Sequence, residues 1–513
     1  MVILRPMGER AVLAEVADLA AVTRLHAALA ADPLPGVDDL VPAACTVLVS
    51  FEPRRTSAAV VGAWVRAAET AVPDAAPPGP RVEVPVRYDG VDLAGTAELL
   101  GIRPDDLVAR HRAAEWTVAF TGFAPGFAYL VSPDWPFDVS RLARPRTRVP
   151  AGAVGLAGAF TGAYPRDTPG GWRLIASTDA VLFDPDAAEP VLLPPRARVR
   201  FVPARERVRV GAADPAGGPS AAATPSPQAT PALRILAPGP LATVQDLGRS
   251  GRASLGVARS GALDRAALRI ANRLVGNAES AAGIEITLGG FRARVESDTW
   301  VAVTGALADV SVNGRAADAY APLLLPAGAE LSIAPARAGL RLYLAIRGGV
   351  DAPTALGSRA TDVLAGLGPA PLRADAVVHS GAAVGEVPAI DGFPWSVPPS
   401  VLEVRLGPGP RAEWFAPAAV DAVVEATWTV SPDLDRIGIR LDGPALARMR
   451  PEELPSEGMR PGAIQVPPHG RPVILLADGP VTGGYPVIGV VPDAALDALA
   501  QVRPGDRVRF RRG

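Results

Sequence analysis

The sequence predicts a mainly β protein that has an N-terminal α+β domain followed by several β-barrels. Three observations support this fold class. Strand and helix patterns alternate over residues 1–78, short apolar strands dominate most of the remainder, and the chain holds 52 glycines and 55 prolines, enough for the many tight turns that such strands need. Because 513 residues are too many for one hydrophobic core, about three or four domains are expected.

Residues 1–78 are predicted to form one sheet covered by two helices. Helical apolar spacing begins at Asp18, and a second helical pattern follows Thr56 or Ser57, both of which are good N-cap residues. Strand patterns precede each helix. Cys45 is the only cysteine and lies in the run CTVLVSF, so an intrachain disulfide and a cysteine-based metal cluster are both excluded.

Residues 79–210 are predicted to form the first β-barrel. An alternating strand pattern opens this region, Asp92 and Pro104 each start a short helix, and strands with tight turns follow to about Val210. Residues 211–232 contain no large apolar side chain and are rich in Pro, Gly, Ala and Ser. This composition predicts a flexible linker between two halves of the chain.

Two further β-barrels are predicted in the second half, over residues 233–395 and 396–513. The first contains a Gly-rich loop that runs into one helix from about Asp264 to Leu274, and the pair Asn313-Gly314 predicts a hairpin turn. At the helix entrance, Asp264 could cap the helix, or the free amides there could bind an anion.

The absence of lysine excludes several mechanisms. All 51 basic residues are arginine, which rules out a P-loop lysine, a Schiff base and covalently bound biotin in this chain. The net charge is −2 and the acids and bases are interspersed, so nucleic acid is not an expected partner. Neither a signal-peptide pattern nor an apolar run of about 18 residues is seen, which predicts a cytoplasmic protein with no membrane contact.

The stretch Glu457–Val490 has the strongest functional pattern. Seven glycines and six prolines separate short apolar strands, so stiff loops could bring backbone amides close to a ligand. A fainter copy lies at Val149–Trp172, because both stretches contain Gly-Ala-Val or Gly-Ala-Ile and later Thr-Gly-x-Tyr-Pro, at Thr161–Pro165 and Thr482–Pro486. This predicts one strand-loop-strand unit used in two related barrels.

Within that stretch, Asp478 directly follows an apolar strand. It could act as a general base, bind a metal or cap a turn, and Thr482 and Tyr485 lie within one turn of it. His469 lies in a rigid Pro-Pro-His-Gly loop and is the best placed of the four histidines for proton transfer. No second histidine or acid stands at metal-ligand spacing from it.

Arginines beside turns are the candidate clamps for an acidic ligand. Gln245, Asp246 and Arg249 lie between glycines, where the Asp-Arg pair could hold a carboxylate or phosphate, or Asp246 could instead close an Asx-type turn. Arg146 precedes the Gly-Ala turn of the fainter copy, where it could be solvated or bind an acidic substrate. The aromatic segment 122–130 suits packing first and a pocket wall second.

These motifs resemble two known families. The first half, through GFAPGFAYL, PRTRVPAGAVG and TGAYPRDTPGGW, resembles the allophanate hydrolase subunit 1 family. The second half, through VQDLGRSG, SGALD, EGMRPGAIQVPPHGRPVIL and DGPVTGGYPVIG, resembles the allophanate hydrolase subunit 2 family. The resemblance implies cyclophilin-like β-barrels and a fusion of the B and C subunits of 5-oxoprolinase. Such a protein acts with a separate A subunit in the ATP-dependent opening of 5-oxoproline to glutamate.

The resemblance also implies ATP and Mg²⁺ as cofactors, although neither the metal ligands nor the ATP site can be assigned. Arg146, Arg249 and Arg460 are then candidates to clamp the substrate, with Gln245 and Asp246 beside them. Candidates for the catalytic groups and backbone donors are Gln465, Thr482, Tyr485, His469, Asp478 and the amides of Gly462, Gly483 and Gly484. The commoner family form TTGGYP is here VTGGYP, with Val481 in place of the first threonine.

Two other functions stay open from sequence. Members of the first family regulate sensor kinases, and homologous domains form the carboxyltransferase part of urea carboxylase. In the second case, biotin would have to be carried by another protein, because this chain has no lysine to attach it. The sequence also leaves open a homo-oligomer.

Overall fold

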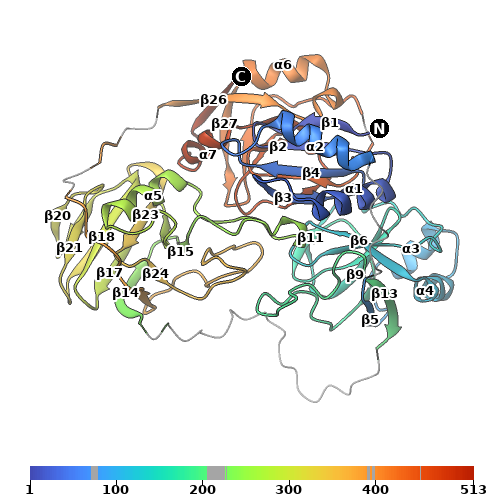
Figure 1. Ribbon diagram of the computed structural model, residues 1–513, viewed down its shortest axis with the longest axis horizontal. Coiled ribbons are helices and arrows are strands. Elements are labelled where there is room, and N and C mark those ends of the chain that lie inside the picture. Colours follow the sequence, from blue (N-terminus) through green and yellow to red (C-terminus); the bar gives the residue numbers. More distant parts are fainter. Residues whose placement is uncertain are drawn as a thin grey trace.

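The computed structural model describes residues 1–70, 79–204, 226, 228–389, 393–395, 399–450 and 452–512. These residues form an N-terminal α+β domain, a first barrel, a two-sheet unit and a C-terminal barrel (Figure 1). The mainly β fold class is therefore confirmed. Most of the predicted linker 211–232 lies outside the described residues, and its end, from Thr230, already belongs to a strand.

The N-terminal domain is a four-stranded sheet in the order β1-β2-β4-β3 with two helices on one face. Asp18 caps the first helix by accepting from Ala21 N at 2.8 Å, and Ser57 Oγ accepts from Val60 N at 3.3 Å. Both predicted helix starts are therefore confirmed. The elements are β1 (Ile3–Pro6), β2 (Ala11–Glu15), α1 (Leu19–Ala31), β3 (Val37–Pro42), β4 (Thr46–Phe51) and α2 (Ala58–Thr70).

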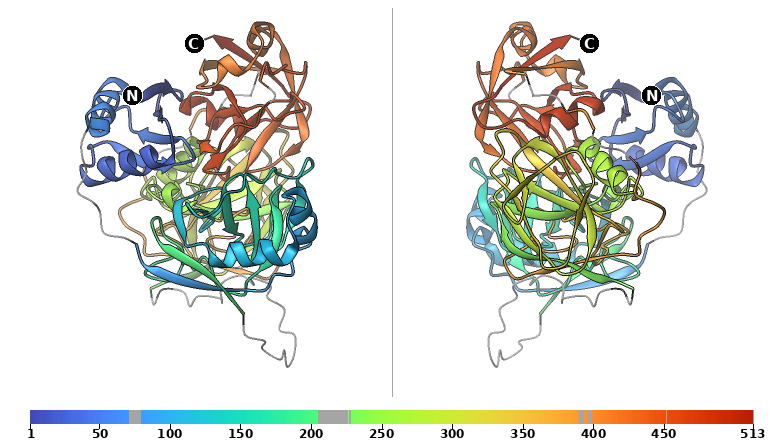
Figure 2. Two further views of the ribbon diagram at one scale, coloured as in Figure 1. Left: turned by 90° about the vertical axis from the view of Figure 1, so that its right-hand side faces the viewer. Right: turned by 90° about the vertical axis from the view of Figure 1, so that its left-hand side faces the viewer.

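The other face of this sheet packs against the C-terminal barrel, more than 400 residues away in sequence. Along β4, Val47 and Val49 face the helices, whereas Leu48 faces the barrel. A Cβ added to Gly458 would lie 2.4 Å from Leu48 Cβ, so glycine is required for this close approach. Figures 1 and 2 show the N-terminal domain beside the C-terminal barrel. Sequence analysis predicted only the helix-covered face.

The first barrel has the strand order β12-β9-β10-β7-β6-β13-β5, and backbone hydrogen bonds of 2.8 and 2.7 Å between Arg87 and Ser177 close it. His111 is buried in its core between Tyr88 and Thr161, and burial lowers its pKa to about 3. The elements are β5 (Arg81–Val86), α3 (Leu93–Leu99), α4 (Pro104–Ala113), β6 (Trp116–Thr121), β7 (Ala128–Val131), β8 (Arg146–Val149), β9 (Ala153–Ala157), β10 (Phe160–Ala163), β11 (Thr168–Gly170), β12 (Arg173–Ser177) and β13 (Arg198–Pro203).

The C-terminal barrel repeats this topology strand for strand, in the closed order β26-β33-β30-β31-β28-β27-β34. In each barrel, one extra two-stranded sheet forms, β8 with β11 and β29 with β32. The elements are β26 (Val401–Pro408), η2 (Ala412–Trp414), α6 (Pro417–Glu425), β27 (Thr427–Leu434), β28 (Gly438–Asp442), β29 (Glu457–Gly458), β30 (Ala463–Gln465), β31 (Val473–Leu475), β32 (Thr482–Gly483), β33 (Val487–Val490), α7 (Asp493–Leu499) and β34 (Arg507–Arg512).

The predicted internal repeat is thus confirmed, but one of its two sequence matches is misaligned. Thr161 lies on β10, which corresponds to β31, whereas Thr482 lies on β32, which corresponds to β11 and so to Thr168. Equivalent strands of the two barrels are better marked by two short sequences that both barrels contain, Trp-Thr-Val and Arg-Val-Arg-Phe. The first places Trp116 and Trp428, each of whose indoles donates to a carbonyl five residues earlier. The second occurs at residues 198–201 and 507–510.

The two-sheet unit encloses one core between a seven-stranded and a five-stranded sheet. Asp264 Oδ1 accepts from Ala267 N at 2.9 Å and caps α5, and Asn313 and Gly314 both have positive φ in the predicted hairpin turn. The elements are β14 (Thr230–Pro238), β15 (Leu241–Gln245), η1 (Ala253–Leu255), α5 (Arg265–Leu274), β16 (Gly283–Thr287), β17 (Phe291–Val295), β18 (Thr299–Leu307), β19 (Val310–Val312), β20 (Arg315–Ala317), β21 (Leu323–Leu325), β22 (Glu330–Ile333), β23 (Ala338–Ile346), β24 (Val350–Asp351) and β25 (Val377–Ser380).

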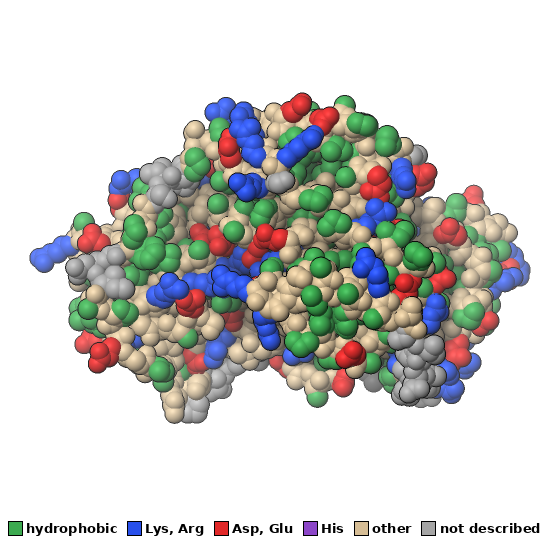
Figure 3. All heavy atoms as spheres, turned by 45° about the horizontal axis from the view of Figure 1, so that its top comes forward, with side chains coloured by type: hydrophobic (Ala, Val, Ile, Leu, Met, Phe, Trp, Pro, Cys, Tyr) green, Lys and Arg blue, Asp and Glu red, His purple; other side chains and the backbone are tan. Residues whose placement is uncertain are grey.

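Among the described residues, no helix is both long and apolar enough to cross a bilayer. The face shown in Figure 3 carries interspersed acidic and basic side chains rather than one broad patch of either sign.

Replacing Leu48 with alanine tests the docking of the N-terminal domain. Because Leu48 is fully buried between that domain and the barrel, Leu48→Ala should lower the free energy of unfolding by roughly 2–5 kcal/mol. Amide exchange should also rise in β29 and β30, not only in β4. Val60→Ala, at a half-exposed position on α2, is the control. Unchanged exchange in the barrel would contradict this docking.

Candidate functional site

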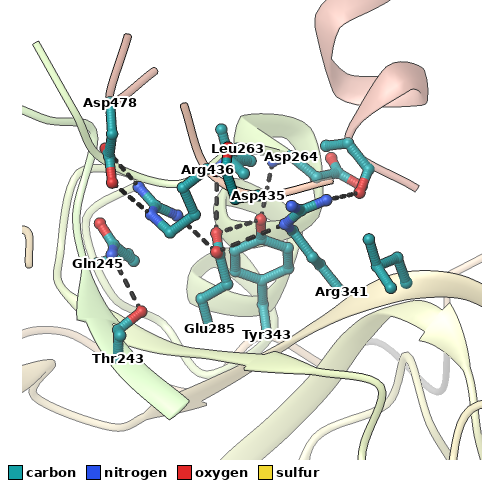
Figure 4. Close-up of polar contacts among 12 residues, drawn as sticks. Thr243, Gln245, Leu263, Asp264, Glu285, Arg341, Tyr343, Asp435, Arg436 and Asp478 are labelled. Carbon is teal, nitrogen blue, oxygen red and sulfur yellow. Dashed lines mark hydrogen bonds and ion pairs between the residues drawn. The ribbon is translucent and has the colours of Figure 1, made fainter. Parts of the chain in front are cut away.

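A group of buried polar residues lies where the two-sheet unit meets the C-terminal barrel (Figure 4). We call it the buried polar cluster. Its members come from the end of β15, the loop after it, β16, the 355–368 loop, and the loops after β27 and β31. They are Gln245, Arg249, Ser260, Glu285, Asp362, Arg436 and Asp478, each no more than 5% exposed.

Arg436 is the centre of this cluster. Its Nε and Nη2 donate to Asp478 at 2.8 and 3.0 Å, its Nη1 donates to Glu285 at 2.5 Å, and Nη2 also donates to Gly261 O at 2.7 Å. Burial opposes the charge of Arg436, yet Asp478 and Glu285 together raise its pKa. Since Glu285 belongs to the two-sheet unit and Asp478 to the barrel, this arginine ties the two together.

Ser260 completes the contacts of Asp478. Its Oγ donates to Asp478 Oδ1 at 2.7 Å, and its φ of +54° is a backbone conformation that serine seldom adopts. Both Asp478 oxygens therefore already accept hydrogen bonds. In this structure Asp478 anchors Arg436, and its role as a base or metal partner stays a prediction.

Arg249 is buried with part of its guanidinium unused. Its Nε donates to Ala355 O at 3.3 Å and its Nη2 to Ala360 O, but Nη1 has no hydrogen-bond partner among the described residues. Burial lowers its pKa, and the nearby carboxylates of Asp362 and Asp246 oppose that shift. A buried N–H group without a partner is costly, so it is available to a ligand or water.

Gln245 has an unused acceptor in the same place. Its Nε2 donates to Thr243 Oγ1 at 3.0 Å and to Thr361 O at 2.9 Å. Its Oε1 is buried and has no partner in the described part of the chain. The carbonyls of Ala360 and Thr361, which accept from Arg249 and Gln245, are followed directly by the acid Asp362.

Asp362 supplies a third unused group. It is 1% exposed, its Oδ1 accepts from Ala365 N at 2.7 Å, and its Oδ2 has no partner among the described residues. Burial, and then the neighbouring charge of Asp478, raise its pKa to about 7, although Arg249 and Arg436 oppose this shift. A carboxyl group that titrates near neutral pH can give or take a proton in catalysis.

The first barrel also reaches this cluster. Arg166 follows β10, and a Cβ added to Gly366 would lie 2.4 Å from Arg166 Nη1. Burial lowers the pKa of Arg166, while Asp362 opposes the shift. Neither Arg166 nor Asp362 is predicted from the sequence patterns. A usable signal was the density of glycines around Asp362, since Gly357, Gly366 and Gly368 all have positive φ.

Asp246 closes a turn rather than holding Arg249. Its Oδ1 accepts from Gly248 N at 2.8 Å and from Ser358 Oγ at 2.6 Å, and its Oδ2 accepts from Arg359 N at 2.7 Å. The Asx-type turn is thus the correct alternative. The predicted Asp246–Arg249 clamp is not formed, because the carboxylate is used up by the turn and the 358–359 loop.

Thr482 and Gln465 lie in a second place, at the interface with the first barrel. Thr482 Oγ1 accepts from Phe123 N at 2.8 Å and is hydrogen-bonded to the Tyr129 hydroxyl. Gln465 Nε2 donates to Tyr485 O at 3.4 Å, and a Cβ added to Gly483 would lie 2.7 Å from that nitrogen. In this structure Thr482 docks one half of the chain onto the other, where sequence analysis expected a donor to the substrate.

The aromatic segment 122–130 packs as its first interpretation expected. Phe127 and Tyr129 contact the rings of Tyr164 and Trp172, and all four belong to one apolar core. Ala128 and Leu130 of the same stretch face the core that the barrel encloses, so the aromatic side chains form a second core on the other face of the strands.

Other predicted residues lie outside the buried polar cluster. His469 is exposed, and its Nδ1 accepts from Arg471 N at 3.2 Å. Tyr485 is 39% exposed beneath the Arg448 guanidinium. The Gly462 amide donates to Leu475 O at 2.8 Å, so in this structure it is used within the barrel.

Arg146, Gly484 and Arg460 are also separate from the cluster. Arg146 pairs with Asp92 at 2.7 Å in the first barrel, and its buried Nη1 has no partner among the described residues. Gly484 lies beside Arg141. Arg460 lines a cleft between the N-terminal domain and the C-terminal barrel. Nowhere in the described ranges do three or more His, Cys, Asp or Glu side chains gather as a metal site would require.

Removing the central arginine tests how the units are joined. Arg436→Gln leaves the buried carboxylates of Asp478 and Glu285 without their main counter-charge, so the free energy of unfolding should fall by roughly 3–5 kcal/mol. Arg440→Gln, an exposed position on β28, should change it by less than about 0.5 kcal/mol. Urea denaturation measures both. Equal stabilities of the two variants would show that the buried ion pairs do not join these units.

The raised pKa of Asp362 predicts a pH-dependent stability. Native Asp362 keeps its proton up to about pH 7, whereas the unfolded chain loses it near pH 4. The native state therefore binds more protons between these values, and stability falls as pH rises across this window. Asparagine does not titrate, so Asp362→Asn does not lose stability in this way. Relative to the parent, its free energy of unfolding should rise between pH 4 and 7, by at most about 4 kcal/mol for roughly three pKa units.

Thermal denaturation at pH 5 and pH 8 checks this prediction. Asp186→Asn, at an exposed turn, should show no such pH dependence relative to the parent. A gain for Asp362→Asn that is the same at both pH values would contradict the raised pKa.

Comparison with known proteins assigns most of the chain to carboxyltransferase-domain models. The family model for the carboxyltransferase domain, subdomain C and D, matches residues 2–193, and that for subdomain A and B matches residues 255–512. The chain is 37% identical over 284 residues to the C subunit of 5-oxoprolinase from Escherichia coli K12, covering 54% of this chain and 90% of that protein.

A second relative matches a different part of the fusion. The B subunit of 5-oxoprolinase from Escherichia coli O157:H7 is 48% identical over 130 residues, covering 25% of this chain and 60% of that protein. The crystal structure of TTHA0988 covers 98% of this chain and 99% of its own, with 35% identity and a TM-score of 0.86. This chain belongs to the carboxyltransferase-domain family, and it carries the C and D and the A and B subdomains fused in one polypeptide.

Proposed function

We propose that the chain is the fused B and C component of an ATP-dependent 5-oxoprolinase. In this proposal it activates 5-oxoproline for ring opening to L-glutamate together with a separate A subunit, in the cytoplasm. The relatives named as the B and C subunits of 5-oxoprolinase support the assignment. The observation that carries it is the set of unused polar atoms in the buried polar cluster.

Those atoms complement a lactam. Arg249 Nη1 is an unused donor that suits the lactam carbonyl oxygen, and Gln245 Oε1 is an unused acceptor that suits the lactam N–H. Asp362, which titrates near neutral pH, could donate a proton to the nitrogen when the ring opens. A lactam has a C=O acceptor and an N–H donor side by side, so it can supply the hydrogen-bond partners that Arg249 and Gln245 lack.

The chemistry explains why such donors are needed. A lactam amide is stable, and transfer of a phosphoryl group to its carbonyl oxygen would make the carbon more reactive. A buried guanidinium aimed at that oxygen stabilises the charge that develops on it. Among the described residues no three His, Cys, Asp or Glu side chains gather, so no Mg²⁺ ligands are assigned and no step is placed on the metal.

Carboxyl transfer is the second candidate function, and the family description favours it. Biotin would then arrive on a separate carrier protein, because this chain contains no lysine. The same unused donor and acceptor would suit an acceptor molecule with an amide or urea group. A purely regulatory role towards a sensor kinase does not account for the second half of the fusion.

The direct test combines the purified chain with the A subunit, ATP, Mg²⁺ and 5-oxoproline and measures glutamate. Arg249→Gln and Asp362→Asn should each lower the rate by about 10²-fold or more, because each removes a group aimed at the reacting amide. Arg440→Gln should leave it unchanged. No glutamate that depends on this chain would remove the assignment, and transfer from a biotinylated carrier in a parallel assay would favour the second candidate.

A further inference from the structure

A cleft of about 130 Å³ lies where three parts of the chain meet. The N-terminal domain supplies one side, the C-terminal barrel the other, and residues 250–265 of the two-sheet unit the end. Apolar side chains form much of its wall, including Val41, Met459, Leu475 and Leu496. A cavity of about 150 Å³ holds a benzene-sized molecule, so this cleft suits a small molecule and is too small for a nucleotide.

Two of the four arginines that line the cleft make no close ion pair among the described residues, although the charge of Asp493 reaches both. Arg10 and Arg265 both pair with Asp493, at 2.8 and 3.1 Å. Arg259 and Arg460 form no ion pair within the described part of the chain. Arg259 Nε donates only to Leu247 O at 3.3 Å, and Arg460 Nη1 only to Met7 O at 3.3 Å.

Arg460 is half-buried and Arg259 is exposed, so Arg460 is the more costly of the two to leave without a close acid. Burial lowers the pKa of Arg460 to about 10, with the charge of Asp493 opposing the shift and that of Arg10 adding to it. Partial burial and the charges of Arg265 and Arg10 lower the pKa of Arg259, while the charges of Asp493 and Asp38 oppose this shift. Each guanidinium has five N–H groups, of which one is used, so both have donors available for a carboxylate.

The cleft also contains two neighbouring acids, Asp38 and Asp39, which differ in how far their carboxylates are used. Asp39 is occupied, because its two oxygens accept from Gly251 N and Ala253 N at 3.0 and 3.1 Å. Asp38 in contrast has only a 4.0 Å contact with Arg10, and burial raises its pKa. Its carboxylate also senses the charge of Arg259, which places it near that arginine.

We propose that this cleft is a ligand site for a small zwitterion, namely an α-amino acid. The carboxylate of the ligand faces Arg259 and Arg460, its ammonium faces Asp38, and its side chain lies against the apolar wall. An anion without an ammonium would leave Asp38 unpaired and close to a second negative charge. A cation would leave both arginines unpaired. Only a molecule with both charges satisfies all three side chains.

The cleft is separate from the buried polar cluster but shares one residue with it. Ser260 lines the cleft and donates to Asp478 inside the cluster. A ligand in the cleft therefore lies one side chain away from the Arg436 network. The inference does not depend on the proposed function, because its test measures binding rather than turnover.

Isothermal titration calorimetry on the full chain tests the site with two matched pairs of probes. L-leucine is compared with 4-methylpentanoate and L-glutamate with glutarate, because the second member of each pair lacks the ammonium. At least one amino acid should bind, and its partner should bind about tenfold more weakly or worse, as expected for loss of a charge-assisted contact. Arg259→Gln and Asp38→Asn should each weaken binding of the amino acid by about tenfold or more.

Arg471→Gln, an exposed arginine outside the cleft, is the matched control and should bind like the parent. Circular dichroism shows whether each variant folds, and both Arg259 and Asp38 are exposed enough to be replaced without loss of a core. No binding of either amino acid at millimolar concentration overturns the site. Equal binding within a matched pair reveals an anion site only, and unchanged affinity in Arg259→Gln places the ligand elsewhere; both results overturn the proposal.

Discussion

The buried pairing of Arg436 with Asp478 and Glu285 holds the second half of the chain in its observed arrangement. Placing three charges out of water is expensive, and it is stable here because the guanidinium makes short bonds to both acids and to a backbone carbonyl. Glu285 is further satisfied by Leu263 N and the Tyr343 hydroxyl. The two-sheet unit and the C-terminal barrel therefore meet in one defined orientation, and that orientation creates the cluster around Arg249 and Asp362.

The two halves of the chain are joined in a similar way, because each buries surface that the other leaves exposed. The N-terminal sheet buries one face against its own helices and the other against the barrel near Gly458. The Phe123 amide of the first barrel donates to Thr482 Oγ1 of the C-terminal barrel. In each case the surface that one unit leaves uncovered is covered by a unit distant in sequence. The fusion of both halves in one chain keeps these partners at high local concentration.

The cluster combines satisfied and unsatisfied polar groups, and this contrast is what points to function. Arg436 and Asp478 have their partners, so they give rigidity. Arg249, Gln245 and Asp362 each retain one buried atom that has no partner in the described part of the chain, at a cost in stability that native proteins seldom accept without a reason. Rigid, satisfied neighbours around unsatisfied groups are what a preorganised site for a small polar ligand requires.

Local signals in the sequence were enough to establish the mainly β class, the helix starts at Asp18 and Asp264, the existence of the barrel repeat, and the exclusion of lysine chemistry. These follow from periodicity, capping and composition, which act over a few residues. Long-range packing, in contrast, was needed to show that Asp246 closes a turn, that Thr482 docks two halves, and that Asp362 and Arg166 approach Arg249. Those outcomes depend on contacts between residues far apart in sequence, which a local pattern cannot specify because the same side chain can serve a turn, an interface or a site.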